Sequence, residues 1–302
     1  MINPASLDLQ SLRIFVIAAH TGSLTLTAEN VHMTISAASR RISELEQHVG
    51  SPLFERKSRG LDLTAAGREL LPHAQSVTAD VERLIDAVVE LENGQRGHIR
   101  IWANTSSLIQ FLPRDLFRFR TQFPNVKIEL EERLSSEIIR ALHSGHIDMG
   151  VIAENTPAVG LERIVYRSDR LVLVVPEDHP IAALPIVSFD DAIKHDFVGT
   201  NHDSAILRLL TNAAASRGQI IRINIQATSF DAILSLIHAG HGVSILPREA
   251  VAKDLVSWRL KSVPLRDAWS RRKLWLTYRA SDALKVEVKN LIEHLSTSSA
   301  IG

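Results

Sequence analysis

The segment from residue 65 to about residue 93 restricts the fold more than any other part of this sequence. Its apolar residues recur at alternating spacings of four and three, which is the heptad period of a helix that packs along a second helix. Thr64 can cap the start of this helix, and Pro72 can bend its first turns. The spacing predicts a two-stranded coiled coil with a second copy of the chain; packing on its own chain is the alternative. The stripe consists of Leu70, Ala74, Val77, Val81, Leu84, Val88 and Leu91.

The chain has different patterns on the two sides of this helix. Residues 7 to 64 have the apolar periodicity of short helices joined by tight turns, whereas strand-like and helix-like segments alternate from Gly97 to the end. Such alternation predicts an α/β architecture with mainly parallel sheets. With 302 residues, the chain has room for about two domains with cores of their own.

Composition excludes several classes of protein. The chain has no cysteine, so a disulfide framework, an Fe–S cluster and a cysteine nucleophile are excluded. Its 34 lysines and arginines balance 34 acidic residues, which permits a local basic face but not a uniformly basic surface. The first residues lack the positive start and cleavage site of a secretion signal, and no run of about 18 apolar residues predicts a membrane span. We therefore expect a cytoplasmic protein.

Three helices are predicted in the first 64 residues. The first begins after Asp8, and the second is capped by Ser23. The third is capped by Thr34 or Ser36 and ends at Gly50. The predicted inward faces are Leu9, Leu12, Phe15, Val16 and Ala19 in the first helix, and Ala38, Ile42, Leu45 and Val49 in the third.

The second and third of these helices have the pattern of a helix-turn-helix, because a tight turn joins them and the later helix is polar and basic outward. Residues 53 to 63 then resemble two short strands around a basic turn, which is a wing.

A solvated charged face on an ordinary three-helix domain is the alternative to a DNA-binding surface. For Arg56, the alternative to a DNA contact is an ion pair with Glu55 or Asp62. Residues 1 to 64 hold six basic and six acidic residues, so DNA binding must come from charge placement and from two domains acting together. The candidate DNA contacts are Ser23, Thr34, Ser36, Ala37, Ser39, Arg40, Arg41, Ser43, Arg56, Lys57 and Arg59.

The first domain and the residues that follow it match a known family at Leu9, Leu12, Phe15, Gly22, Ser23, Ala28, Ser39, Ile42, Leu45, Glu46, Gly50, Pro52, Leu53, Phe54, Arg56, Leu63, Thr64, Ala66 and Gly67. By these residues, residues 7 to 67 resemble the N-terminal domain of LysR-type transcriptional regulators. The resemblance implies a winged helix-turn-helix that binds double-stranded DNA as a homodimer, commonly within a tetramer, with RNA polymerase as a further partner. One departure is Ile35, where family members often carry Gln; Ile offers a base only apolar contact with a thymine methyl.

A possible anion site follows the first strand of the C-terminal half. Residues 97–101 read as a strand, residues 104–107 are small and polar, and a helix is expected from there to about Gln122. Backbone N–H groups and the dipole at a helix start favour a carboxylate or phosphate. Ordinary capping by Ser106 or Ser107 is the alternative.

The C-terminal half is similar to the effector-binding domain of the same family, which resembles periplasmic solute-binding proteins. The resemblance rests on Gly97, Ile99–Ile101, Leu142, Gly145, Asp148, Val175, Pro176, His179, Pro180, Ala239, Gly240, Gly242 and Pro247. It implies two α/β lobes around a cleft, with a small effector contacted by Ser106, Ser135, Thr200 and Ser229. Hydroxyl groups at helix starts in such a cleft favour an anion. Local chemistry adds Ser107 and Phe230. The implied division is residues 7–64 for DNA binding, 65–93 for the linker helix and 97–296 for the effector, with lobe I from 97–165 and 269–296 and lobe II from 166–268.

Nothing in the sequence predicts an enzyme, a metal site or a cofactor. The phosphate-loop, dinucleotide-binding and nucleophile-elbow patterns are absent. The histidine pairs 143/146 and 238/241 lack the spacing of a zinc protease. Trp102 stands where the family has a small residue, and it either narrows the cleft, stacks on a ligand or packs in the core. The prediction is a ligand-responsive DNA-binding regulator; a constitutive DNA-binding protein with a structural C-terminal half is the alternative.

Overall fold

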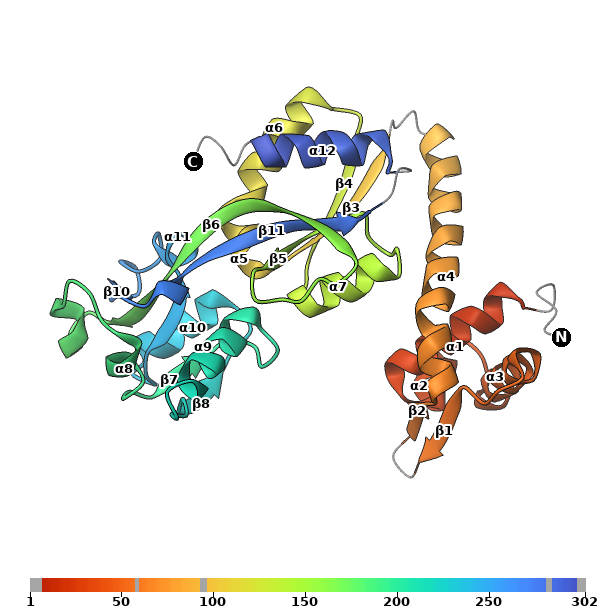
Figure 1. The fold of residues 1–302 in the computed structure, drawn as a ribbon, viewed down its shortest axis with the longest axis horizontal. Helices are drawn as coiled ribbons and strands as arrows, with labels where there is room; N and C mark the ends of the chain where they lie inside the picture. Colours follow the sequence, from red (N-terminus) through yellow and green to blue (C-terminus); the bar gives the residue numbers. More distant parts are fainter. Residues whose placement is uncertain (1–6, 58–59, 93–96, 281–283, 298–302) are drawn as a thin grey trace. The chain divides into compact units, whose positions relative to one another are not determined.

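The computed structural model describes residues 7–57, 60–92, 97–280 and 284–297. Two compact units are present: helices and a small hairpin build the N-terminal one, and sheets with covering helices build the C-terminal one (Figure 1). The N-terminal unit contains α1 (Leu9–Thr21), α2 (Leu24–Asn30), α3 (Ile35–Val49), β1 (Phe54–Lys57), β2 (Gly60–Leu63) and α4 (Ala65–Glu92). No helix within the described ranges is both long enough and apolar enough to cross a membrane.

Local capping sets the three short helices as the sequence predicts. The side chains of Asp8, Ser23 and Thr34 each accept a hydrogen bond from a backbone N–H in the first turn of α1, α2 and α3. Gly22 and Gly50 end α1 and α3 in the left-handed conformation, which costs glycine little. Caps that bond within three residues depend only on neighbouring sequence, so they could be predicted without the tertiary structure.

The buried face of α1 differs from the predicted one at its start. Leu9 is 40% exposed, whereas Ile14 and Ala18 are buried beside Leu12 and Phe15. The cause is that α1 contacts α2, α3 and α4. Three neighbours bury a wider arc of a helix than the single stripe that periodicity assumes. In α3 the predicted Ala38, Ile42 and Leu45 are buried, and Val49 packs at the edge of the same core.

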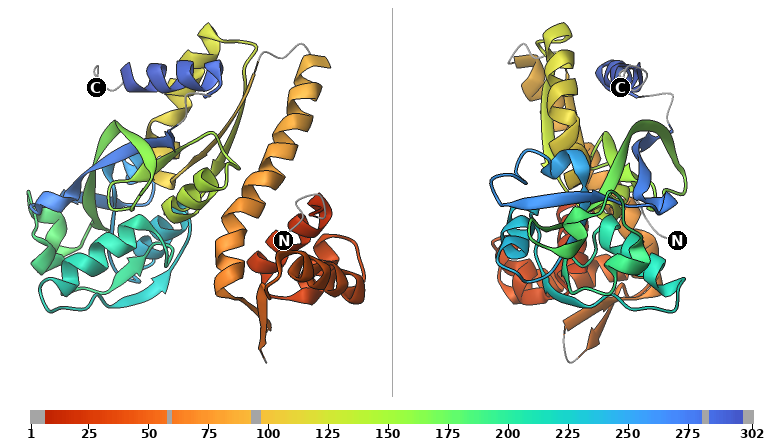
Figure 2. Two further views of the ribbon diagram at one scale, coloured as in Figure 1. Left: turned by 45° about the vertical axis from the view of Figure 1, so that its right-hand side comes forward. Right: turned by 90° about the vertical axis from the view of Figure 1, so that its left-hand side faces the viewer.

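The wing is a short antiparallel hairpin that extends away from the three helices (Figure 2). Its second strand is tied to the end of α1, because the N–H of Leu61 donates to the carbonyl of Gly22 at 2.8 Å. Gly60 makes this approach possible: a Cβ at this position would lie 2.3 Å from that carbonyl oxygen. The wing is therefore fixed against the helix-turn-helix by backbone contact.

The C-terminal unit is a mixed α/β structure. Within the described residues its main sheet has the strand order β10-β6-β11-β5-β3-β4, with β9 also paired to β6, and a separate pair joins β7 to β8. Its elements are β3 (His98–Ala103), α5 (Thr105–Gln110), α6 (Leu112–Gln122), β4 (Lys127–Glu132), α7 (Ser135–His143), β5 (Met149–Ala153), β6 (Leu161–Pro176), η2 (Pro180–Ala183), α8 (Phe189–Ala192), β7 (Phe197–Gly199), α9 (Ala205–Ala215), β8 (Ile223–Gln226), α10 (Phe230–His238), β9 (Ser244–Pro247), α11 (Arg248–Val251), β10 (Leu260–Pro264), η3 (Ala268–Ser270), β11 (Arg271–Arg279) and α12 (Val286–Thr297).

The prediction of mainly parallel sheets is wrong. β3 is parallel to β4 and β5, and β7 is parallel to β8, but β6 pairs antiparallel with β9, β10 and β11, and β11 is antiparallel to β5. The long strands β6 and β11 run side by side in opposite directions, one leading into the second lobe and the other returning from it (Figure 1). A returning strand beside an outgoing one must be antiparallel.

Two hydrophobic cores define the lobes. The core of the first lobe contains residues of β3, β5, α6, β11 and α12, including Ile101, Phe119 and Leu291. The core of the second contains residues of the later part of β6 with α8, α9 and α10, including Phe189 and Ile233. The helix expected from residue 104 to residue 122 is broken at Phe111 into α5 and α6; α6 begins at Leu112, with Pro113 in its first turn, where proline is tolerated.

Candidate functional site

The outer surface of α3 carries the predicted DNA contacts. Arg40 projects furthest, with its side chain 81% exposed, and its Nε lies 2.7 Å from Glu44 Oε1. This hydrogen bond lowers the pKa of Glu44. Ser36 is exposed and Ser39 and Ser43 are half-buried on the same helix. A surface of short side chains around one long cation lets a helix backbone approach a groove closely.

The wing and α3 form one surface. Arg56 Nη2 on β1 donates to Ser39 Oγ on α3 at 2.9 Å. An ion pair of Arg56 with Asp62 was the sequence-based alternative, but the wing residue paired with Asp62 is Lys57. That hydrogen bond raises the pKa of Lys57. Both wing cations are exposed, so the hairpin and the helix present their charges together.

The remaining predicted contacts have local structural roles as well. Ser23 and Thr34 cap α2 and α3 through their hydroxyl oxygens. Ala37 and Arg41 are half-buried, and Arg41 Nη1 lies 3.5 Å from Asp8 Oδ2. Arg59 lies outside the described residues.

Ile35, the departure from the family pattern, is the first residue of α3 and is 48% exposed. Its position at the helix start leaves an apolar side chain exposed on the surface of α3.

The predicted seam on α4 is divided between two environments. Leu70 and Ala74 pack on the core of their own chain, which was the alternative to a dimer seam. Further along, Val77, Leu84 and Val88 are 44%, 65% and 55% exposed. Val81 is half-buried, and the side chain of Leu91 lies outside what the structure describes.

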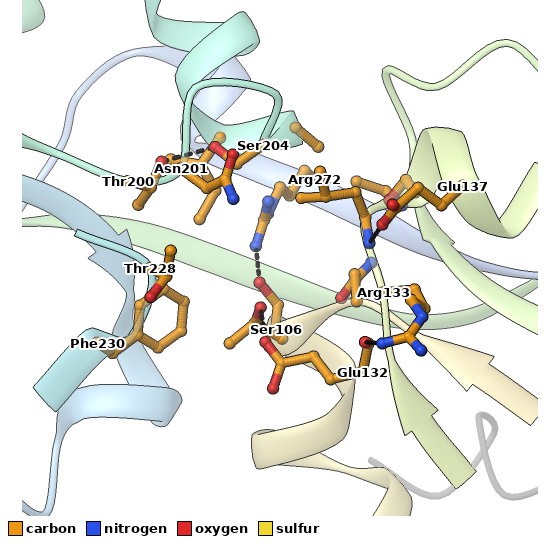
Figure 3. A pocket seen from close by; sticks show the side chains of 17 residues that line it. Ser106, Glu132, Arg133, Glu137, Thr200, Asn201, Ser204, Thr228, Phe230 and Arg272 are labelled. Atoms are coloured by element: carbon orange, nitrogen blue, oxygen red, sulfur yellow. Dashed lines mark hydrogen bonds between the residues drawn. The ribbon is translucent and has the colours of Figure 1, made fainter. Parts of the chain in front are cut away.

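A cavity of about 390 Å³ lies where the two lobes meet. Figure 3 shows side chains from both lobes converging on it. Its lining comes from Asn104, Thr105, Ser106, Glu132, Arg133, Leu134, Ser135, Glu137 and Ala153 in the first lobe, Thr200, Asn201, Ser204, Ala205, Ile206, Thr228 and Phe230 in the second, and Arg272 on β11.

Arg272 organises the wall of this cavity. Its Nε and Nη2 each lie 2.6 Å from an oxygen of Asp169 on β6, and Nη2 also donates to Ser106 Oγ at 2.7 Å. The side chains of Arg272 and Asp169 are only 6% and 0% exposed. A bidentate pair at this burial fixes the guanidinium plane, so the cavity has a rigid cationic group at its base.

Four of the six predicted effector contacts line this cavity. Ser106 accepts from Arg272, and Thr200 Oγ1 lies 2.6 Å from Ser204 Oγ (Figure 3). Ser135 Oγ accepts from Ala153 N at 3.2 Å. Phe230 covers the side from the second lobe.

Ser107 and Ser229 are not part of the lining. Ser107 is fully buried and its hydroxyl donates to the carbonyl of Asn104, while Ser229 caps α10. The first turn of α5 is capped by Asn104, whose Oδ1 accepts from Ser107 N at 2.9 Å, so the alternative of capping by Ser106 or Ser107 is wrong in the residue it names.

The sequence did not indicate Arg272 or the charged rim. Glu132 Oε1 accepts from Thr105 Oγ1, Glu137 Oε2 accepts from Leu134 N, and Arg133 lies 5.0 Å from the centre of the Trp102 ring. Trp102 itself does not line the cavity. Asn104 was recognisable as a polar residue after a strand, and its buried Nδ2 has no hydrogen-bond partner among the described residues. Within those same ranges, no three His, Cys, Asp or Glu side chains gather as a metal site would require.

The fold and these sites define a DNA-binding regulator with a ligand-binding domain. Residues 9–68 match the profile of the bacterial regulatory helix-turn-helix proteins of the LysR family, and residues 92–300 match the LysR substrate binding domain. The chain therefore belongs to the LysR family of bacterial transcriptional regulators. Members of this family regulate transcription and are not enzymes.

Relatives agree with this assignment. The chain is 32% identical over 255 residues to the HTH-type transcriptional regulator IlvR of Caulobacter vibrioides, covering 80% of this chain and 82% of IlvR. It is 27% identical over 299 residues to a probable RuBisCO transcriptional regulator of Nostoc sp., covering 94% and 88%.

Solved structures show the same fold. CbnR, a LysR family transcriptional regulator, superposes with a TM-score of 0.66 at 20% identity, covering 97% of this chain and 99% of CbnR. The Synechocystis CcmR regulatory domain, solved in complex with 2-PG, gives a TM-score of 0.62 at 19% identity, covering 68% and 98%.

Proposed function

We propose that a small anion bound in the cavity between the lobes modulates operator binding or promoter activation by this regulator. The observation that carries the proposal is the cavity itself, which joins side chains of both lobes to a buried arginine on a strand that connects them. A ligand that contacts both lobes stabilises one relative arrangement of them, and coupling of this kind is typically about 1–3 kcal/mol. The related CcmR domain was solved with a small ligand, 2-PG.

The donors in the cavity favour a ligand rich in acceptor oxygens. Arginine has five N–H donors, and the contacts of Arg272 with Asp169 and Ser106 leave Nη1 for a ligand. Asn104 Nδ2 is a second buried donor without a partner among the described residues. The carboxylates of Glu132 and Glu137 already accept hydrogen bonds from the protein, which reduces their repulsion of an anion. A carboxylate or other oxyanion fits this set best.

We further propose that the chain acts in the cytoplasm as a homodimer through α4, and as a tetramer of two dimers, with RNA polymerase as a further partner. The exposed apolar residues of the later part of α4 support pairing of two copies. The proposed division is residues 7–64 for DNA binding, 65–93 for the linker and 97–296 for the effector. Two paired copies would present two α3 helices to a pseudo-palindromic site whose half-sites lie about one helical turn, or a multiple, apart.

A thermal-shift screen of small organic acids tests the effector site. Wild-type protein should be stabilised by at least one acid, and the double variant Ser106→Ala/Thr200→Ala should lose that shift because both hydroxyls line the cavity. Ser229→Ala is the matched control: it removes a helix cap worth about 1 kcal/mol but no cavity contact, so the ligand-induced shift should remain. If the double variant kept the full shift of every hit, the site would be wrong. If no acid changed operator affinity or footprint, the C-terminal half would be structural only.

Two variants of the DNA-binding surface should have different effects. Arg40→Ala should relax specificity at one base pair, lowering the preference for the cognate base about tenfold or more, because Arg40 is the most exposed cation on α3. Lys57→Ala should weaken binding to all sequences alike and reduce the salt slope by about 0.9, as loss of one phosphate contact does. Both effects are measured by titrating cognate and random duplexes at several salt concentrations. Equal losses on both duplexes for both variants would contradict the assigned roles.

A further inference from the structure

A second cavity, of about 680 Å³, lies beside the strands that connect the two lobes, and cations dominate its lining. Arg170 comes from β6, Arg271 and Lys273 from β11, and Arg248 from α11. The cavity of about 390 Å³ between the lobes is called the effector cavity. Arg272, which forms part of the wall of the effector cavity, also lines this second cavity.

The register of β6 and β11 explains how the two cavities come to share one pair of strands. Residues 168–170 of β6 pair with residues 271–273 of β11 and form the crossover ladder. In it Arg271 stands opposite Arg170, Arg272 opposite Asp169, and Lys273 opposite Ser168. Successive side chains on a strand point to opposite faces. The side chains of Arg272 and Asp169 are buried, and those of Arg170, Arg271 and Lys273 alternate with them along the two strands; all five residues line the second cavity.

The crossover ladder leaves a like-charge pair without compensation. Like charges directly opposite each other on antiparallel strands destabilise the pairing. Neither Arg170 nor Arg271 has an ion pair within the described part of the chain. Glu154 on this cavity accepts a backbone hydrogen bond from Lys273 N at 3.0 Å, and Glu249 lies 3.8 Å from Arg248 Nε, so the contacts of both carboxylates are with residues other than the arginine pair.

Three arginines of the same unit have acidic partners. Arg272 binds Asp169, Arg167 Nη2 lies 2.7 Å from Asp115, and Arg217 contacts Asp190 and Asp267. Arg170 and Arg271, in contrast, stand opposite each other with Lys273 beside them, and all three line one cavity.

We propose that this cavity is a second ligand site and that it binds a multiply charged phosphate-type anion, such as a pyrophosphate or a phosphate ester. The guanidinium fork matches phosphate oxygens in two-point hydrogen bonds, and a dianion between Arg170 and Arg271 converts their repulsion into attraction to a shared group. The site is distinct from the effector cavity and goes beyond the proposed function.

The position of the site gives it a regulatory consequence. Both strands of the crossover ladder connect the lobes, and Arg248 extends the site to α11, which directly follows β9. Arg272 borders both cavities, so an anion in one changes the surroundings of the guanidinium that the other ligand meets. Coupling between two such sites is reciprocal: each ligand alters the affinity of the other by the same factor.

Calorimetric titration of the full-length protein with sodium pyrophosphate, at constant ionic strength, tests the proposal. We expect one site per chain in the wild type and binding at least about tenfold weaker in Arg170→Gln/Arg271→Gln, which loses two charge-assisted contacts. The matched control is Arg118→Gln/Arg120→Gln, which removes two exposed arginines of α6 and the same net charge, and which should bind within about twofold of wild type. Because the first variant removes like-charge repulsion, its melting temperature without anion should equal or exceed that of the wild type.

Three results would overturn the proposal. The first is that the wild type does not bind pyrophosphate. The second is that both double arginine variants lose affinity for pyrophosphate equally. The third is that only Ser106→Ala/Thr200→Ala loses affinity, which would place pyrophosphate in the effector cavity. None of these results bears on the organic-acid screen or on operator binding, so failure of this site is distinguishable from failure of the proposed function.

Discussion

Replacement of Leu84 and Val88 by glutamate should convert the protein into a monomer and lower its operator affinity by about 10²–10⁴-fold. The two side chains are 65% and 55% exposed, and they lie four residues apart on one face of α4. Four carboxylates in a paired seam would be desolvated and would repel one another, whereas an isolated helix would keep them in water. The loss of affinity follows from separating two DNA-binding units that otherwise act as a linked pair.

Sedimentation equilibrium gives the mass, and titration of an operator duplex gives the affinity. Leu84→Met/Val88→Ile is the matched control, because it changes the same positions while keeping them apolar; it should remain dimeric and bind DNA. Circular dichroism should show unchanged helix content in both variants. A glutamate variant that stayed dimeric would show that α4 does not hold the copies together, and a monomer with full operator affinity would show that pairing is not needed.

Replacement of Asp169 by alanine should destabilise the C-terminal unit by about 3–5 kcal/mol. Removing one partner of a buried ion pair leaves the other charge without compensation, and both side chains here are almost completely buried. Gln110 Nε2 also lies 3.3 Å from Asp169 Oδ2 and would lose that acceptor. The freed Arg272 would no longer be held against Ser106, so the thermal shift from a cavity ligand should fall as well.

Calorimetric melting of the full chain measures this effect. Asp190→Ala is the control: its carboxylate contacts Arg217 but is 59% exposed, so the cost should be less than about 1 kcal/mol. The double variant Asp169→Ala/Arg272→Met should recover most of the stability, because it removes the uncompensated charge and fills its volume. Similar losses for Asp169→Ala and Asp190→Ala would mean that burial of the Arg272–Asp169 ion pair does not raise its contribution to the free energy of unfolding.

Much of the DNA-binding half could be predicted because its determinants are local. Asp8, Ser23 and Thr34 cap helices within three residues of themselves, and the inward positions of α3 repeat with the helical period. The predictions that failed there concern buried faces, and they have one cause. Helix α1 and the first turns of α4 pack against several neighbouring elements, whereas helical periodicity assumes that only one stripe of each helix is buried. Leu9 is therefore exposed, and Leu70 and Ala74 pack on their own chain instead of extending the exposed seam.

The effector cavity was predictable only in part. Ser106, Ser135, Thr200 and Phe230 line it, and each is close in sequence to the end of a strand or the start of a helix. Arg272 gave no such signal, because its partners Asp169 and Ser106 are 103 and 166 positions away in the chain. No local pattern carries information about a contact at that separation.

The sequence by itself determined the helix caps, the helix-turn-helix, the apolar stripe of α4 and the alternation of strands and helices, because each depends on residues within a few positions of one another. Only the tertiary structure decided that β6 and β11 pair in opposite directions and that their register sets Arg272 against Asp169 and Arg271 against Arg170. Strand register depends on how segments far apart in the sequence pair across the sheet. The register of β6 and β11 therefore determines which charged side chains line each of the two cavities.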